Sequence, residues 1–110
     1  MSETKEFVPS IFLTGINTPI CATYLVTKPD FLLGQAYDCD AILDFSKEIS
    51  RFHAQITWNE KTGYSIIDLD SSNKTFVNGH VLAPKVSYPL KPGDKIVFSS
   101  YQFQVEQINY

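Results

Sequence analysis

Residues 49–79 read ISRFHAQITWNEKTGYSIIDLDSSNKTFVNG, and this stretch decides the fold of the chain. It begins and ends with a short polar loop, and two largely apolar runs separated by a turn lie between the loops. Each loop offers hydroxyl groups, and together the loops supply an arginine, a lysine and an asparagine. Hydroxyls, cations and backbone N–H groups that meet at one place suit a phosphate group. The stretch therefore indicates a phosphopeptide-binding site at one end of a β-sandwich.

Two hairpins are expected in this region. Residues 54–58 alternate strictly between the two faces of a strand, and residues 64–69 form the return strand after a loop closed by Gly63. The dipeptide Asn78-Gly79 then separates two short β-rich runs, which is the strongest short hairpin signal. Both patterns predict antiparallel strand pairs.

The rest of the chain shows the same alternation of short strands and turns. Further strands or edge-type connectors are expected at residues 11–14, 20–27, 31–33, 41–45, 84–89, 96–98 and 101–105. No window of helical length keeps a 3.6-residue period. We therefore predict an all-β antiparallel sandwich, in which residues 7–110 form one domain and residues 1–6 a flexible N-terminal tail.

Composition and charge narrow the class of protein. A chain of 110 residues fits one domain with one core, and its net charge of -3 argues against a dedicated nucleic-acid binder. Cys21 and Cys39 lie in no metal-binding spacing, so we expect free thiols in a reducing compartment, without zinc or another cofactor. We find no signal-peptide pattern and no apolar run of membrane-spanning length. These features favour a cytoplasmic protein, or the cytosolic domain of a larger one, that makes no membrane contact.

Several short motifs occur in a fixed order along the chain. They are Gly34, Asp40, Ser50-Arg51-Phe52-His53-Ala54, Asp68-Leu69, Ser72-Asn73, Thr75-Phe76-Val77-Asn78-Gly79 and Gly93-Asp94. As a set, these residues resemble the forkhead-associated (FHA) domain family, and the resemblance covers most of the chain. It implies a sandwich of about eleven strands, of the SMAD/FHA type, whose loops at one end bind phosphothreonine peptides. It also implies a Ser/Thr kinase upstream that produces the phosphothreonine.

The resemblance assigns roles to five residues of the two polar loops. Ser50 matches the serine whose hydroxyl contacts the phosphate, and Arg51 matches a position that often adds a second contact. His53 matches a histidine that supports the loop from beneath without touching the ligand. Ser72 matches the small hydroxyl residue that meets the phosphate from the second loop. Asn73 matches the asparagine that pairs with the peptide backbone.

Two residues depart from the family pattern, and both belong to the expected binding site. Gln35 follows Gly34 where the family usually has an arginine, which removes a charge-assisted bond worth roughly 1.5–3 kcal/mol. Lys74 stands where the family usually has glycine, and it could restore positive charge or point into solvent. Structural support of the site is expected from Gly34, His53, Thr75, Asn78 and Gly79.

Other interpretations remain open at this level. The loop serines could cap local backbone groups, and Asn73 could form an Asx-turn. The aspartates at 38, 40 and 44 could be ordinary turn and strand-end residues, or they could line the cleft and favour basic peptides. The departures at Gln35 and Lys74 also fit a degenerate domain that binds a partner independently of phosphate. An enzyme is disfavoured, because no nucleophile elbow, metal-ligand spacing or phosphate-cradling glycine loop is present.

Overall fold

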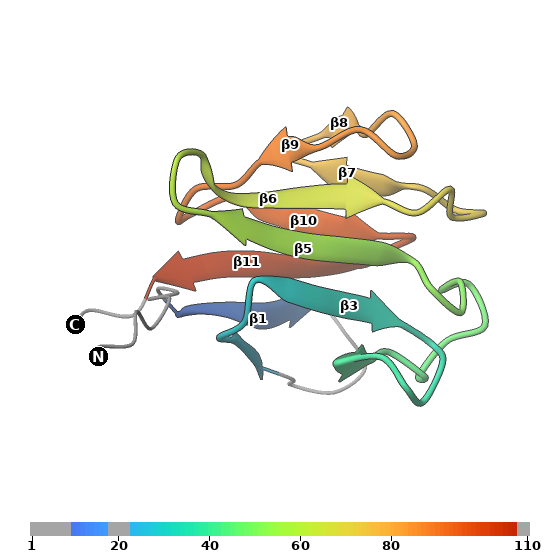
Figure 1. Cartoon of the computed structure of the whole chain (residues 1–110). Helices are drawn as coiled ribbons and strands as arrows, with labels where there is room; N and C mark the ends of the chain where they lie inside the picture. The colour runs from blue at the N-terminus through green and yellow to red at the C-terminus, as the bar shows by residue number, and fades with distance from the viewer. Residues whose placement is uncertain (1–9, 18–22, 108–110) are drawn as a thin grey trace.

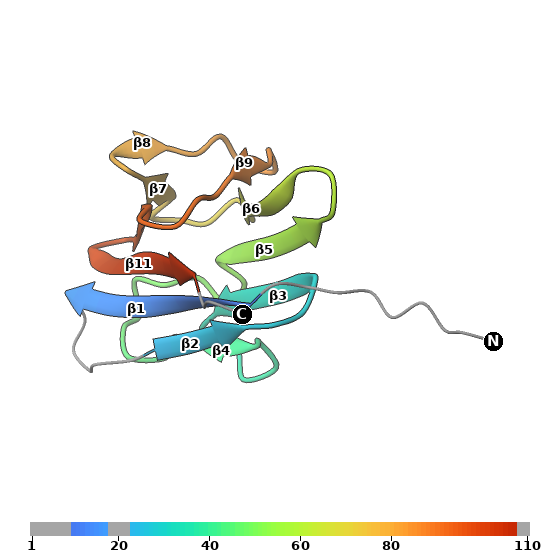
Figure 2. The same ribbon diagram turned by 90° about the vertical axis from the view of Figure 1, so that its left-hand side faces the viewer.

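The computed structural model describes residues 10–17 and 23–107, and within these ranges the chain forms two packed β-sheets (Figure 1). One sheet has six strands in the order β2-β1-β11-β10-β7-β8, and the other has five in the order β4-β3-β5-β6-β9. The strands are β1 (Ile11–Asn17), β2 (Thr23–Val26), β3 (Asp30–Gly34), β4 (Ala41–Ile42), β5 (Ala54–Asn59), β6 (Gly63–Asp68), β7 (Thr75–Val77), β8 (His80–Val81), β9 (Tyr88–Pro89), β10 (Lys95–Phe98) and β11 (Tyr101–Gln107). Figure 2 shows the two sheets as facing layers. The predicted all-β sandwich of about eleven strands is confirmed.

The core lies between the two layers and follows from the alternation of each strand. In β1, Leu13 is buried while Phe12 and Thr14 on either side are partly exposed. The same period of two governs β11, where Phe103 and Val105 face inward. The largest fully buried apolar side chains come from both sheets and from one loop: Phe98, Phe103, Leu13, Leu33, Leu43, Ile49, Ile56, Ile66 and Ile96.

Strand pairing is mainly antiparallel, as expected. Strands β5 and β6 pair over six residues from Ala54↔Asp68 to Asn59↔Gly63, and Gly63 closes their hairpin with a φ of 77°. The β7–β8 hairpin turns at Asn78 and Gly79, which both have positive φ. One pair departs from the prediction, because β3 and β4 run parallel.

Some expected strand limits are wrong. Strand β1 continues to Asn17, beyond the expected residues 11–14, because an irregularity in its pairing with β11 lets the ladder continue past Gly15. Strand β4 ends at Ile42, since the chain then turns and buries Leu43 in the core. The expected strand at 20–27 is described only from residue 23. The expected tail at 1–6 lies outside the described residues.

The connections that matter for binding lie at one end of the sandwich. The β3–β4 loop (residues 35–40), the β4–β5 loop (43–53), the β6–β7 loop (69–74) and the short β10–β11 turn (99–100) all lie on the right-hand side of Figure 1. The two polar loops that flank the β5–β6 hairpin in the sequence are therefore neighbours in space. This arrangement follows from the hairpin itself, which starts and finishes at the same end.

Candidate functional site

His53 joins the β4–β5 and β6–β7 loops from beneath. Its Nδ1 accepts the backbone N–H of Ser50 at 3.1 Å, and its Nε2 lies 2.9 Å from the carbonyl oxygen of Lys74. Because Nδ1 is an acceptor, the ring carries its proton on Nε2 and donates it to that carbonyl. The side chain is fully buried, and its ring packs edge-on against Phe98.

The environment of His53 favours the neutral imidazole. Burial lowers its pKa, and the hydrogen bond to Lys74 and the charge of Asp68 oppose this effect without cancelling it. A second ring proton would place an N–H against the N–H of Ser50. The neutral ring is therefore part of the geometry that presents Ser50.

The serines of the two loops meet directly. Ser50 Oγ accepts the backbone N–H of Ser72 at 3.1 Å. This contact uses a lone pair of the Ser50 hydroxyl and leaves its O–H free to donate to a ligand. Ser50 is half-buried and Ser72 is exposed, so the pair lies at the surface between the loops.

Asn73 and Glu48 extend this connection to a third segment. Asn73 Nδ2 donates to the carbonyl oxygen of Glu48 at 2.8 Å, and the Ser99 hydroxyl donates to Glu48 Oε1 at 2.6 Å. The amide of Asn73 keeps its oxygen and a second N–H for another partner. Asn73 therefore links the loops as well as offering polar groups at the surface.

A buried carboxylate shapes the β6–β7 loop. The carboxylate of Asp68 is fully buried and accepts hydrogen bonds from the hydroxyls of Ser71 and Thr75 and from the N–H of Ser71. These three donors satisfy the charge in place of water. They also fix the backbone on both sides of Ser72 and Asn73.

Gly34 allows the β4–β5 loop to lie against the end of β3. A Cβ at Gly34 would stand 2.8 Å from the carbonyl carbon of Arg51 and 3.0 Å from the backbone nitrogen of His53. The next residue, Gln35, donates its N–H to the Ser50 carbonyl at 3.0 Å, and Ala36 donates to the Arg51 carbonyl at 3.1 Å. The absence of a side chain at Gly34 thus sets the position of the Ser50-Arg51 backbone.

The side chain of Gln35 is engaged within the domain. Its Nε2 donates to the carbonyl oxygen of Ser46 at 2.7 Å, and the residue is half-buried. Gln35 therefore anchors the β4–β5 loop to the end of β3.

Two cations at the site have no carboxylate partner among the described residues. Arg51 and Lys74 are exposed, and the ion pair found in the described part of the chain joins Lys28 to Asp40 instead. Lys74 adopts a left-handed backbone with φ of 70°, the conformation that a glycine would take without strain. The loops thus carry two exposed positive charges without an ion-pair partner among the described residues, one next to Ser50 in the sequence and one two residues after Ser72.

The remaining expected residues fall into two groups. Asp40 forms a local ion pair with Lys28. Burial alone would raise the pKa of Asp40, but hydrogen bonds from Lys28 and the Leu32 N–H outweigh this effect, so the pKa is lowered overall.

Asn78 lies at the end of β7 opposite to Thr75, where its amide donates to Asp94 and accepts the Lys95 N–H. The Asn78-Gly79 turn therefore stabilises the β7–β8 hairpin and lies away from the two polar loops, whereas Thr75 is part of the Asp68 network.

Neither a metal cluster nor a membrane-spanning helix is found in the described part of the chain. No group of three His, Cys, Asp or Glu side chains within residues 10–17 and 23–107 could hold a metal ion. In the same ranges no helix is long and apolar enough to cross a membrane. Cys39 is a buried free thiol, while Cys21 lies outside the described residues.

Comparison with known families decides the class of this domain. The FHA domain family model matches residues 31–99, which is more than half of the chain. The chain belongs to the FHA domain family. The matched region contains both polar loops, the Gly34 turn and the β7–β8 hairpin. The predicted family is confirmed.

Individual relatives of this FHA domain agree with that result. The chain is 32% identical over 96 residues to the E3 ubiquitin-protein ligase CHFR of Xenopus tropicalis, which covers 87% of this chain and 15% of that protein. A structure of Mycobacterium tuberculosis EmbR in complex with a low-affinity phosphopeptide has 28% identity and a TM-score of 0.78 over 93% of this chain and 26% of that one. An FHA domain of a hypothetical Arabidopsis thaliana protein superposes with a TM-score of 0.84 at 23% identity, over 100% and 97% of the two chains.

Sequence reasoning did not identify all the residues that hold the loops of this FHA domain. Asp68 was part of the family motif, but its network with Ser71 and Thr75 was not foreseen. The bridge from Glu48 to Asn73 and Ser99 was also missed. The sequence does carry a signal for the Asp68 network, because an aspartate at a strand end followed by a serine three residues later favours an Asx-type turn.

Proposed function

We propose that this FHA domain binds phosphothreonine-containing peptides or proteins and so reads the product of a Ser/Thr kinase. The observation that carries the proposal is the Ser50 hydroxyl, held by the contacts of Ser50 with His53 and Ser72, in two joined loops that also carry the exposed cations Arg51 and Lys74. A phosphothreonine carries about −1.5 to −2 charge at neutral pH and three strong acceptor oxygens. The site offers donors and positive charge to match both.

Each loop residue has a separate role in the proposed complex. The Ser50 O–H and the Ser72 hydroxyl donate to phosphate oxygens, and the Arg51 guanidinium supplies the charge-assisted bonds. Lys74 adds a flexible positive charge from the other side. The free oxygen and N–H of Asn73 pair with the peptide backbone.

Gln35 is not assigned a phosphate contact in this proposal. Its side-chain amide is already used by the Ser46 carbonyl, so it acts as an internal anchor of the loop. Arg51 and Lys74 then carry the electrostatic attraction that the family arginine usually shares. We expect binding to be strongly salt-dependent, since both cations are exposed.

Several properties of the whole protein are proposed on the same basis. We propose a cytoplasmic binding module without catalytic activity, nucleic-acid binding or membrane contact, in which residues 7–110 form the domain and residues 1–6 a tail. The chain spans only 15% of the length of the CHFR relative.

Fluorescence anisotropy with paired peptide pools tests the proposal. One pool carries a fixed phosphothreonine among random neighbours, and the other carries plain threonine. We expect clear preference for the phosphorylated pool and a loss of about ten- to a hundredfold for Arg51→Ala, the range of a charge-assisted bond. Lys61→Ala, in the exposed β5–β6 turn at the opposite end, is the charge-matched control. Equal binding of both pools would indicate a phosphate-independent scaffold.

A further inference from the structure

An open pocket of about 470 Å³ lies directly beside the proposed phosphate site. It is lined by Gln35, Asp44, Phe45, Ser46 and Lys47. The Gln35 N–H donates to the Ser50 carbonyl at 3.0 Å, so one wall is bonded to the residue that would hold the phosphate. The Ile49 N–H lies 3.4 Å from the Ser46 carbonyl, which closes a turn and brings the opposite wall back toward Ser50. The pocket is therefore adjacent to the backbone segment that carries Ser50.

The pocket walls are held in place before any ligand arrives. Gln35 Nε2 donates to the Ser46 carbonyl at 2.7 Å and joins two sides of the pocket. The Phe45 ring is half-buried and packs edge-on against Tyr101, with ring centroids 4.9 Å apart. A preformed wall of this kind costs little ordering entropy on binding.

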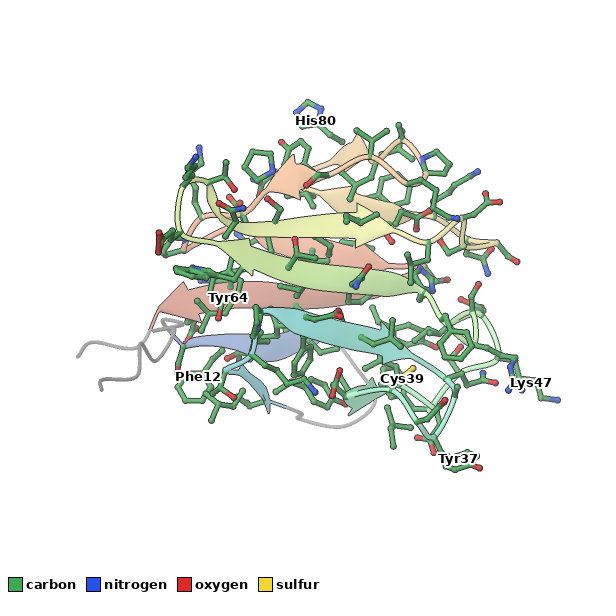
Figure 3. The ribbon with its side chains drawn as sticks, in the orientation of Figure 1. Phe12, Tyr37, Cys39, Lys47, Tyr64 and His80 are labelled. Carbon is green, nitrogen blue, oxygen red and sulfur yellow. The ribbon has the colours of Figure 1, made fainter. Side chains whose placement is uncertain are left out.

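Asp44 is the acidic residue in the lining of the pocket. Its carboxylate is exposed and forms no ion pair with the described residues. Lys47 also lines the pocket, but Figure 3 shows its side chain extending outward from the tip of the β4–β5 loop. The negative charge of Asp44 is therefore not neutralised by its neighbour.

We propose that this pocket accepts a lysine or arginine side chain of the phosphothreonine peptide, with the cationic group at the Asp44 carboxylate and the aliphatic stem on the Phe45 ring. Long cationic side chains combine an apolar stem with a charged end, and the pocket offers a partner for each. An acidic side chain at the same position would meet an uncompensated carboxylate. The ligands would then be products of kinases that phosphorylate threonine near basic residues. This inference rests on the proposed function, because the phosphate must first fix the peptide at Ser50.

Three phosphothreonine pools test the inference by fluorescence anisotropy. In each pool the positions flanking the phosphothreonine are restricted to lysine and alanine, to alanine alone, or to glutamate and alanine. We expect the wild-type domain to favour the basic pool over the alanine pool by about three- to tenfold, the range of exposed charge and cation–π contacts. The variant Asp44→Asn should lose this preference and keep its affinity for the alanine pool. Asp44 makes no described hydrogen bond, so the near-isosteric change should leave the fold intact.

A matched control separates the pocket from the net charge of the domain. Glu60→Gln removes one exposed carboxylate from the β5–β6 turn, at the far end of the sandwich, and should retain the full preference for the basic pool. Equal preference in the wild-type domain and in Asp44→Asn would overturn the inference while the phosphothreonine site stands. No discrimination between the three pools by the wild-type domain would do the same. Binding to none of the phosphorylated pools would overturn both the inference and the proposed function.

Discussion

The Cα of Gly34 lies so close to the carbonyl group of Arg51 that no side chain fits between them. Replacing Gly34 by alanine must push the Ser50-Arg51 backbone away from β3. We expect Gly34→Ala to lower the free energy of unfolding by about 1–3 kcal/mol, the usual cost of overpacking. Phosphopeptide affinity should fall as well, because the displaced segment carries the proposed phosphate ligands. Urea unfolding and anisotropy measure the two effects.

The control for this prediction is Gly79→Ala in the β7–β8 turn. A Cβ there meets no atom within 4 Å, but the φ of 86° makes alanine strained. This variant should lose stability without losing peptide affinity. The account of Gly34 fails if Gly34→Ala binds peptide as tightly as the wild-type domain.

Lys74 occupies a left-handed backbone position that suits glycine. Replacing it by glycine should raise the free energy of unfolding by about 1 kcal/mol, because the strain is relieved. Lys74→Ala removes the same charge and keeps the strain, so it should not gain this stability. Both variants should weaken phosphopeptide binding equally if the ammonium group supplies the contribution of Lys74. Stability gains of the same size in the two variants would refute the strain argument.

The lowered pKa of His53 makes stability depend on pH. The unfolded chain binds a proton at this histidine near pH 6.5, while the folded domain resists protonation until the pH is lower. The contribution of neutral His53 to the free energy of unfolding is therefore fully present above about pH 6.5. It decreases as the pH is lowered toward the pKa of His53 in the folded domain. His80→Gln, at an exposed position, should keep this dependence. An NMR titration that places the His53 pKa at or above its ordinary value would contradict the prediction.

The buried Asp68 carboxylate should be important for stability. Asp68→Asn exchanges an acceptor for an amide that cannot accept all three hydrogen bonds from Ser71 and Thr75. We expect a loss of about 1–3 kcal/mol in the free energy of unfolding, the cost of unsatisfied buried groups. The neighbouring exposed Asp70→Asn should change stability by less than about 0.5 kcal/mol. Similar urea midpoints for the two variants would show that the network is unimportant.

Most of the fold could be predicted from the sequence because its signals are local. Strict alternation in residues 54–58, the Asn78-Gly79 dipeptide and the glycine-closed turn at Gly63 each specify a hairpin through short-range geometry. The length of β4 is shorter than the sequence predicts, since the chain leaves the sheet after Ile42 to bury Leu43. The burial of Leu43 depends on residues that are distant in the sequence. The parallel pairing of β3 with β4 was missed for the same reason.

The sequence identifies some residues of the candidate site and leaves the role of others open, depending on the kind of contact that each residue makes. Ser50, His53 and Ser72 were chosen through family motifs, and the structure brings them together. The engagement of Gln35 by Ser46 depends on the three-dimensional path of the β4–β5 loop, so the sequence left the role of Gln35 open. Asn78 belongs to the same family motif as Thr75. The two residues nevertheless lie at opposite ends of β7, because Thr75 begins this strand and Asn78 follows its last residue.

The central claim is that phosphothreonine binds between the β4–β5 and β6–β7 loops. The most direct measurement is an NMR titration of the ¹⁵N-labelled domain with one phosphothreonine peptide and with its unphosphorylated counterpart. We predict that the phosphorylated peptide shifts the backbone N–H signals of Ser50, Arg51, Ser72 and Lys74, and that the unphosphorylated peptide leaves them unchanged. Shifts confined to other surfaces, or the same shifts with both peptides, would contradict the account.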